Sequence, residues 1–147
     1  LHAMQDKIDT LKKSASSKQA RIKEVDELLR MVDYYKSGKP ATDKLKSIRF
    51  EKSRQKYKAE HDDELRTFYM AERKLKPYFK DGKLPITAWR KERAQLEQEY
   101  RDIQTELSPL HADAKKLWAI HYNIYEVQHE QERQNTELRQ KKQEIEH

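Results

Sequence analysis

The sequence predicts an all-α chain, an elongated antiparallel coiled-coil stalk with a small helical tip formed by three main helices. Charged residues make up 39% of the 147 positions and hydrophobic residues 35%, with only two glycines and four prolines, a composition typical of long helices. The apolar residues also recur at alternating spacings of three and four, which a disordered chain has no reason to keep. We therefore expect a single elongated helical domain over residues 1–147. Because the chain starts within this pattern and without an initiator methionine, we also expect it to be a piece of a longer protein.

The first helix is predicted from the N-terminus to about residue 36. Its apolar stripe weakens at Ala15 and Lys18 and strengthens again up to Tyr35. A stripe of this spacing is a coiled-coil seam. Its members are Met4, Ile8, Leu11, Ala15, Lys18, Ile22, Val25, Leu29 and Val32.

This helix is expected to stop in the stretch YYKSGKPATD. Gly38 can take the left-handed conformation that often ends a helix, and Pro40 opposes its continuation. Thr42 or Asp43 would then cap the next segment. The sequence therefore predicts a break between residues 36 and 42.

A second helix is predicted over about residues 54–80, preceded by a short turn or loop, on the spacing of its apolar residues. Pro77 should kink or end it. Asp81 and Gly82 form a turn dipeptide, and Pro85 suits the start of a helix. The stretch YFKDGKLPITAWRKE is thus a connection between helices, and we expect Trp89 to be at least half buried against the helix around residues 68–75.

The third helix is predicted from about residue 86 to the end of the chain. Its stripe keeps the same phase through Leu107 and Leu110, so we interpret Pro109 as a kink within a continuous helix. Beyond Val127 the stripe fades, and it returns weakly at Leu138 and Ile145.

The first and third helices are predicted to pair antiparallel so that partner numbers sum to about 149. Val25 would then face Ile124, and Leu11 would face Leu138. The stalk would comprise residues 1–36 with 110–145, and the tip residues 42–107. A parallel homodimer that uses the same stripes is the alternative.

Positive charge gathers on the predicted tip. Residues 36–58 hold nine Lys or Arg against Asp43 and Glu51, an excess of seven that exceeds the net charge of +6 of the whole chain. Such a cluster favours an acidic partner, and phosphate neutralisation needs no base-reading motif. The candidate nucleic-acid contacts are Lys44, Lys46, Arg49, Lys52, Arg54, Lys56, Lys58, Arg90 and Lys91.

Aromatic residues lie among these basic residues, as a site that stacks single-stranded bases would require. They are Phe50, Tyr57, Tyr78, Phe79 and Trp89. The competing interpretation is that these rings belong to the core and that the lysines form a solvated face.

The sequence gives no sign of catalytic chemistry. The chain has no cysteine, which excludes thiolate metal sites and disulfides, and His111, His121 and His129 are too widely spaced on one helix to share a metal. His61 and Glu64 are better suited to a packing contact or a helix cap than to a catalytic dyad. We expect no enzyme activity, metal, cofactor or small-molecule substrate in this chain. No apolar run approaches a membrane span, so we expect no membrane insertion and a cytoplasmic location.

The run HDDELRTFYMAERKLKPYFKDGKLPITAWRKERAQLEQEYRDIQTEL resembles the C-terminal helical region of relaxases, the mobilisation nucleases of conjugative and mobilisable elements of Gram-positive bacteria. The resemblance covers about residues 20–125. In that family a more continuous helix is expected where YKSGKPATDKL stands here. The matching positions are His61, Glu64, Tyr69, Ala71, Leu84, Pro85, Trp89, Glu92 and Leu96.

The resemblance implies a parent protein that nicks DNA at a transfer origin, in the bacterial cytoplasm. Its nuclease motifs, a histidine cluster and a strand-cleaving tyrosine, belong to another domain, so the tyrosines of this chain inherit no catalytic role. This chain would be an accessory region that grips DNA, single- or double-stranded and without sequence specificity, or docks to relaxosome or coupling proteins. The alternative is a coiled-coil scaffold or adaptor that does not bind DNA.

Overall fold

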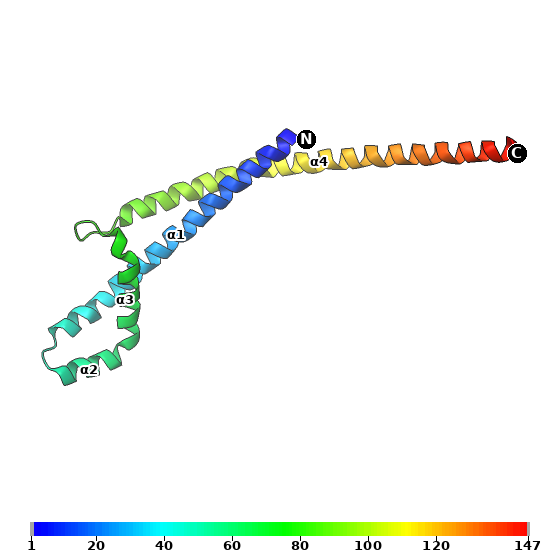
Figure 1. Ribbon diagram of the computed structural model, residues 1–147. Coiled ribbons are helices and arrows are strands. Elements are labelled where there is room, and N and C mark those ends of the chain that lie inside the picture. The colour runs from blue at the N-terminus through cyan, green and yellow to red at the C-terminus, as the bar shows by residue number, and fades with distance from the viewer. Residues whose placement is uncertain (1, 147) are drawn as a thin grey trace. The chain divides into compact units, whose positions relative to one another are not determined.

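The computed structural model describes residues 2–146, and it confirms the all-α prediction. The helices are α1 (His2–Ser47), α2 (Glu51–Glu60), α3 (Asp62–Leu75), the short 3-10 helix η1 (Lys76–Tyr78) and α4 (Ile86–Glu146) (Figure 1). Within this part of the chain, the isolated bridge between Lys80 and Lys83 is the only β-type pairing. The chain divides into two compact units, unit 1 (Leu1–Ser14 with Asp102–His147) and unit 2 (Ala15–Arg101).

The core of unit 2 forms where α1, α3 and the start of α4 meet. Trp89 is only 5% exposed and lies in one cluster with Ala71 and Leu75 of α3, which confirms the prediction for this tryptophan. From α1 the cluster includes Val25, Leu28, Met31 and Val32. Burial of a side chain as large as tryptophan contributes strongly to holding α4 in unit 2.

The predicted break after residue 36 is wrong, because α1 continues through Gly38 and Pro40 to Ser47. Gly38 instead permits a close helix crossing, since a Cβ atom there would lie 2.7 Å from the Cβ of Phe68. Beside it, the Tyr35 and Phe68 rings stack with centroids 4.9 Å apart.

The segment after Pro40 is held in the helix by packing. A proline inside a helix costs about 3 kcal/mol because it removes one backbone hydrogen bond and crowds the preceding turn. The burial of Ala41 and Leu45 against Leu65 of α3 offsets this cost, and the hydroxyl of buried Thr42 donates to the Lys39 carbonyl at 2.8 Å. Packing of α1 against α3 therefore accounts for the continuity of α1 through Pro40.

The second predicted helix, over residues 54–80, is divided in the structure. His61 separates α2 from α3: its N–H donates to the Tyr57 carbonyl, and its own carbonyl accepts from Leu65 N–H, both at 3.0 Å. The His61 ring packs on Tyr57 with centroids 4.2 Å apart, which is the packing contact that the sequence indicated. Its side chain makes no cap hydrogen bond.

The connection from α3 to α4 follows the predicted turn. α3 ends at Leu75, and η1 follows with Pro77 inside it. Asp81 and Gly82 both have positive φ (52° and 73°), as a two-residue hairpin turn requires. Lys80 and Lys83 exchange two backbone hydrogen bonds of 2.9 Å across it, and the Pro85 carbonyl accepts from Trp89 N–H as α4 begins.

In unit 1 the N-terminal part of α1 lies beside α4. Ile8 is almost fully buried, as are Ile103, Leu107 and Ala114, and the Lys7 ammonium lies 3.5 Å from the Glu106 carboxylate. From residue 115 to residue 145 every described side chain is exposed except that of His129, which is half-buried. In Figure 1 this end of α4 has no other segment of unit 1 beside it.

The continuous helix through Pro109 is confirmed, but the predicted pairing register is wrong. In unit 2, Lys18 and Arg21 of α1 contact Glu99 and Glu92 of α4. Partner numbers therefore sum to about 115 rather than 149. The residues that were predicted to complete the stalk are exposed, namely Leu117, Ile124, Val127 and Leu138.

Candidate nucleic-acid interface

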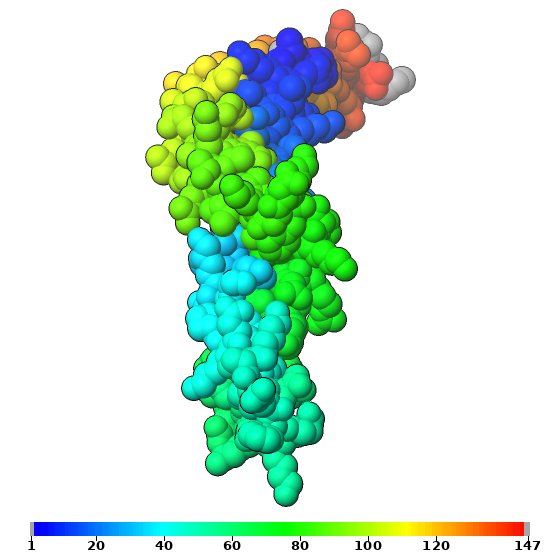
Figure 2. Space-filling model, turned by 90° about the vertical axis from the view of Figure 1, so that its left-hand side faces the viewer, coloured from blue at the N-terminus to red at the C-terminus, as the bar shows by residue number. Residues whose placement is uncertain are grey.

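Seven of the nine predicted contacts lie in one continuous stretch, residues 44–58. It comprises the last turn of α1, the connecting loop and most of α2, and we call it the basic hairpin. Figure 2 shows the end of α1 and α2 (cyan) together at one end of unit 2. The residues are Lys44, Lys46, Arg49, Lys52, Arg54, Lys56 and Lys58.

The loop of the hairpin is short and set by its backbone. Phe50 is extended (φ −90°, ψ 133°) and precedes the first residue of α2, and its carbonyl accepts from the Arg54 N–H at 2.9 Å. α2 buries none of its own residues fully. Tyr57 packs against the cluster of Ala41, Leu45 and Leu65 and Arg54 is half-buried, while the other side chains of α2 are exposed.

Six of the seven basic side chains are exposed, and Arg54 is half-buried. Within residues 2–146 none of the seven forms an ion pair, and the hydrogen bonds of α2 involve other side chains. The Lys44 ammonium lies 5.8 Å from the centre of the Tyr57 ring. The buried Nε of Arg54 has no hydrogen-bond partner in this part of the chain. The positive charge of the hairpin is therefore not neutralised by nearby carboxylates.

In contrast, the cations between α1 and α4 in unit 2 have carboxylate partners. Arg21 donates to both oxygens of Glu92, Nε to Oε1 at 2.6 Å and Nη2 to Oε2 at 3.2 Å. The bond from Arg21 lowers the pKa of Glu92, and the bond from Lys18 lowers the pKa of Glu99. Shifts in this direction indicate that the charged forms are stabilised by their partners.

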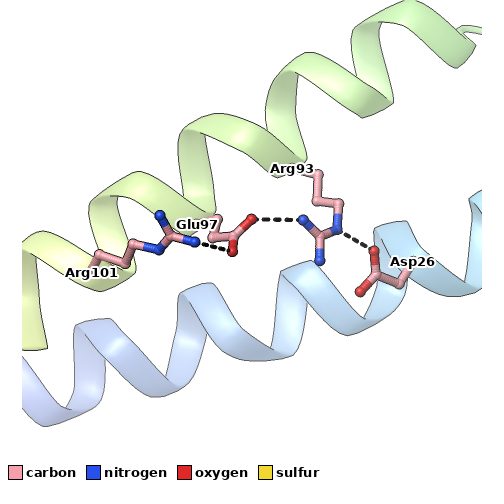
Figure 3. A network of polar contacts seen from close by, with 4 residues as sticks. All are labelled: Asp26, Arg93, Glu97 and Arg101. Atoms are coloured by element: carbon pink, nitrogen blue, oxygen red, sulfur yellow. Dashed lines mark hydrogen bonds and ion pairs between the residues drawn. The ribbon is translucent and has the colours of Figure 1, made fainter.

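A second network extends the pairing along α4 (Figure 3). Arg93 donates to Asp26 of α1 and to Glu97 one turn further along α4, and Arg101 donates to the other oxygen of Glu97. The bonds to Asp26 and Glu97 raise the pKa of Arg93. The sequence did not identify this ionic role, because Asp26 faces Arg93 only in the register that the structure shows.

The other two predicted contacts, Arg90 and Lys91, do not join the basic hairpin. Both are exposed in the first turns of α4, where neighbouring Trp89 packs near Val32, whereas the hairpin packs near Ala41. Nine residues of α1 separate these two points, a distance of about 13 Å along a helix. In Figure 1 the start of α4 lies apart from α2.

The five aromatic residues divide between core and surface. Trp89 is buried, Phe79 packs on the same cluster, and Tyr57 packs under the hairpin. Tyr78 lies edge-on to Trp89 with centroids 5.4 Å apart. Phe50 is 75% exposed at the turn of the basic hairpin, so it is the ring most open to a stacking partner. The sequence predicted the burial of Trp89 but could not separate Phe50 from the other three.

Other kinds of site have little support in the part of the chain that the structure describes. No group of three or more His, Asp or Glu side chains there is placed to hold a metal ion. No described helix is both long and apolar enough to cross a membrane.

The positions that carry the relaxase resemblance lie mostly at the junction of α3 and α4. Ala71 and Trp89 belong to the core cluster, Leu84 packs against it, and Glu92 pairs with Arg21. These residues shape the junction and form no separate site. Comparison with protein-family models, curated proteins and solved structures finds no match for this chain.

Proposed function

We propose that this chain is a non-catalytic helical region of a DNA-processing protein of the relaxase class, and that its basic hairpin contacts DNA phosphates without sequence preference. The observation that carries the proposal is the contrast in charge pairing. Cations between α1 and α4 have carboxylate partners, while six exposed cations of the hairpin have none within residues 2–146. Cations without ion-pair partners can neutralise DNA phosphates and release their counterions without first breaking an ion pair.

Phe50 favours a single strand as the ligand. The ring stands at the turn of the hairpin, between Arg49 and Lys52 in sequence, and is largely exposed. Stacking of a base on such a ring contributes about 1–3 kcal/mol and needs an unpaired base. A phosphate-binding surface with one exposed ring is therefore better suited to the displaced strand of a nicked duplex than to an intact duplex.

A second role, docking to relaxosome or coupling proteins, is favoured by a different observation. The apolar side chains of α4 between residues 117 and 127 are exposed, and apolar patches of this kind mark interaction sites. These residues do not overlap the basic hairpin, so docking is compatible with the DNA role, but a docking protein would compete for them with a second copy of the chain.

The DNA role is tested by two charge-reversal variants with the same net charge. The first replaces Lys46, Lys52, Lys56 and Lys58 with Glu. The matched control replaces four exposed lysines outside the hairpin, Lys12, Lys13, Lys141 and Lys142. Each variant changes the net charge by four times two, from +6 to −2, so a difference between them reports position and not total charge.

Binding of a labelled 20-nucleotide strand is measured by fluorescence anisotropy. The unmodified chain should lose about a hundredfold in affinity between 50 and 200 mM salt, as expected for about five phosphate contacts to a single strand. The hairpin variant should lose binding, and the control should retain most of it. Equal losses in the two variants, or none, would remove the DNA role.

A Phe50→Ala variant separates stacking from charge. It should weaken single-strand binding by about 1–3 kcal/mol and leave duplex binding and the salt dependence unchanged. The relaxase assignment itself is tested by the sequence encoded upstream of residue 1, where a nuclease domain with a histidine cluster is expected and an unrelated domain would contradict it.

A further inference from the structure

The exposed apolar part of α4 has a composition unlike the surface around it. Between residues 117 and 127, LWAIHYNIYEV, Glu126 is the only charged residue. Seven large apolar side chains are between 38% and 61% exposed, and exposed apolar stretches of this kind mark interaction sites. The seven side chains are Leu117, Trp118, Ile120, Tyr122, Ile124, Tyr125 and Val127.

The order of side chains on this helix suits pairing with itself. Leu117, His121, Ile124 and Gln128 follow the three-four spacing of a coiled-coil seam, flanked on one side by Trp118 and Tyr125 and on the other by Ile120 and Val127. If two copies run antiparallel with partner numbers that sum to about 245, the seam residue Leu117 faces Gln128 and His121 faces Ile124. Each flank then meets the same flank of the other copy, so that Trp118 lies beside Tyr125 and Ile120 lies beside Val127. A two-fold interface needs this self-complementarity.

The charges on either side of this section select the direction. Residues 111–116 carry two lysines and one aspartate, whereas residues 126–137 carry four glutamates and one arginine. An antiparallel pair brings the basic flank of one copy to the acidic flank of the other, and a parallel pair places the four glutamates beside four more. Opposite charges across the seam fix orientation in coiled coils.

The part of α1 that belongs to unit 1 leaves this section of α4 uncovered. In unit 1 the buried side chains of α4 end at Ala114, and residues 115–145 keep helical structure without a covering segment from unit 1. Helix stability in water comes mainly from packing of an apolar face, so a bare helix of this length gains stability from any partner that covers it.

We propose that residues 117–128 of α4 pair antiparallel with the same residues of a second copy of this chain, which makes the protein a homodimer. The pairing uses none of the basic hairpin, so the proposed DNA role and the dimer stand or fall separately.

Sedimentation equilibrium over about 1–100 μM tests the association. The unmodified chain should be a dimer at the upper end of this range. Ile124→Lys, which places a charge in the seam, should raise the dissociation constant at least a hundredfold. The control Asn123→Lys adds the same charge on the polar side of the helix and should leave it within threefold. A chain that stays monomeric at 100 μM overturns the proposal.

Cross-linking tests the direction, because the natural chain has no cysteine and single cysteines report without background. A mixture of Leu117→Cys and Gln128→Cys chains, treated with a short bis-maleimide, should give the mixed dimer. Each variant alone should cross-link poorly, since equal positions in the antiparallel pair are separated by 11 residues, about 16 Å along the axis. Efficient cross-linking of Leu117→Cys alone would show a parallel pair and overturn the proposed arrangement.

Discussion

The two tryptophans of the chain lie on the same helix and have opposite surroundings. Trp89, near the start of α4, is 5% exposed in the core of unit 2, and Trp118, in its C-terminal half, is 53% exposed. Both belong to stretches of apolar residues at helical spacing. An apolar stripe of this spacing therefore indicates that a helix face is covered, but it does not indicate which segment covers it. For the first half of α4 the partner is α1 with α3, and for the second half we propose another copy of the chain.

The largest difference in stability should come from replacing each of these tryptophans with alanine. Trp89→Ala removes the anchor between α3, α1 and α4 and should lower the free energy of unfolding by about 3–5 kcal/mol. Trp118→Ala should lower it by less than about 1 kcal/mol in dilute solution, because its side chain has little contact to lose. Urea unfolding followed by circular dichroism measures both. Equal losses would show that Trp118 is also packed within the monomer.

The close crossing of α1 and α3 should give the next largest effect. Gly38→Val puts a branched side chain where a Cβ atom alone would lie 2.7 Å from the Cβ of Phe68. The resulting overpacking should cost about 1–3 kcal/mol, and it should do so even though valine is a better helix former than glycine. Thermal unfolding is the measurement, with Ser37→Ala on the same turn as control. A stabilised Gly38→Val chain would mean that the helices do not approach as described.

The ion pairs between α1 and α4 should contribute least. Glu92 has a lowered pKa in the folded chain because Arg21 donates two hydrogen bonds to it. The contribution of Glu92 to the free energy of unfolding is therefore fully present above the pKa of an unfolded glutamate, about 4.3. It is lost as the pH falls through the pKa of Glu92 in the folded chain. The pair is partly exposed, so screening limits its effect to about 1 kcal/mol or less.

Glu92→Gln should therefore be slightly less stable than the unmodified chain at pH 7, and the difference should vanish toward pH 3. The control Glu126→Gln, at an exposed position of α4, should show no such difference at either pH. A gap between Glu92→Gln and the unmodified chain that widens in acid would contradict the assigned direction of the pKa shift.

Local features of the fold were predictable from the sequence because their causes are local. The Asp81 and Gly82 turn follows from backbone preference, and the continuity of α4 through Pro109 follows from the unbroken phase of its stripe. The burial of Trp89 followed from its position after this turn. The break at Gly38 was predicted wrongly because the packing of Phe68 against that glycine comes from a distant part of the chain.

The pairing register could not be read from the stripes, because the same spacing fits many registers. Pairing the most apolar positions of the two helices gave facing residue numbers that sum to about 149. In the structure the helices pair in another register, with ionic contacts such as that of Arg21 with Glu92. In the candidate site, charge clustering pointed to residues 44–58, and the structure shows that six of the seven basic side chains there are exposed. Charge clustering also selected Arg90 and Lys91, which are basic and exposed but lie at the start of α4, in another part of unit 2.

Amide hydrogen exchange along α4, read by mass spectrometry at about 1 and 100 μM, tests whether its first half is covered within the chain and its second half only by another copy. Peptides from residues 86–110 should exchange slowly at both concentrations. Peptides from residues 115–130 should exchange quickly in the dilute sample and become protected in the concentrated one. Equal protection of both halves at 1 μM, or fast exchange of residues 115–130 at both concentrations, would contradict this arrangement.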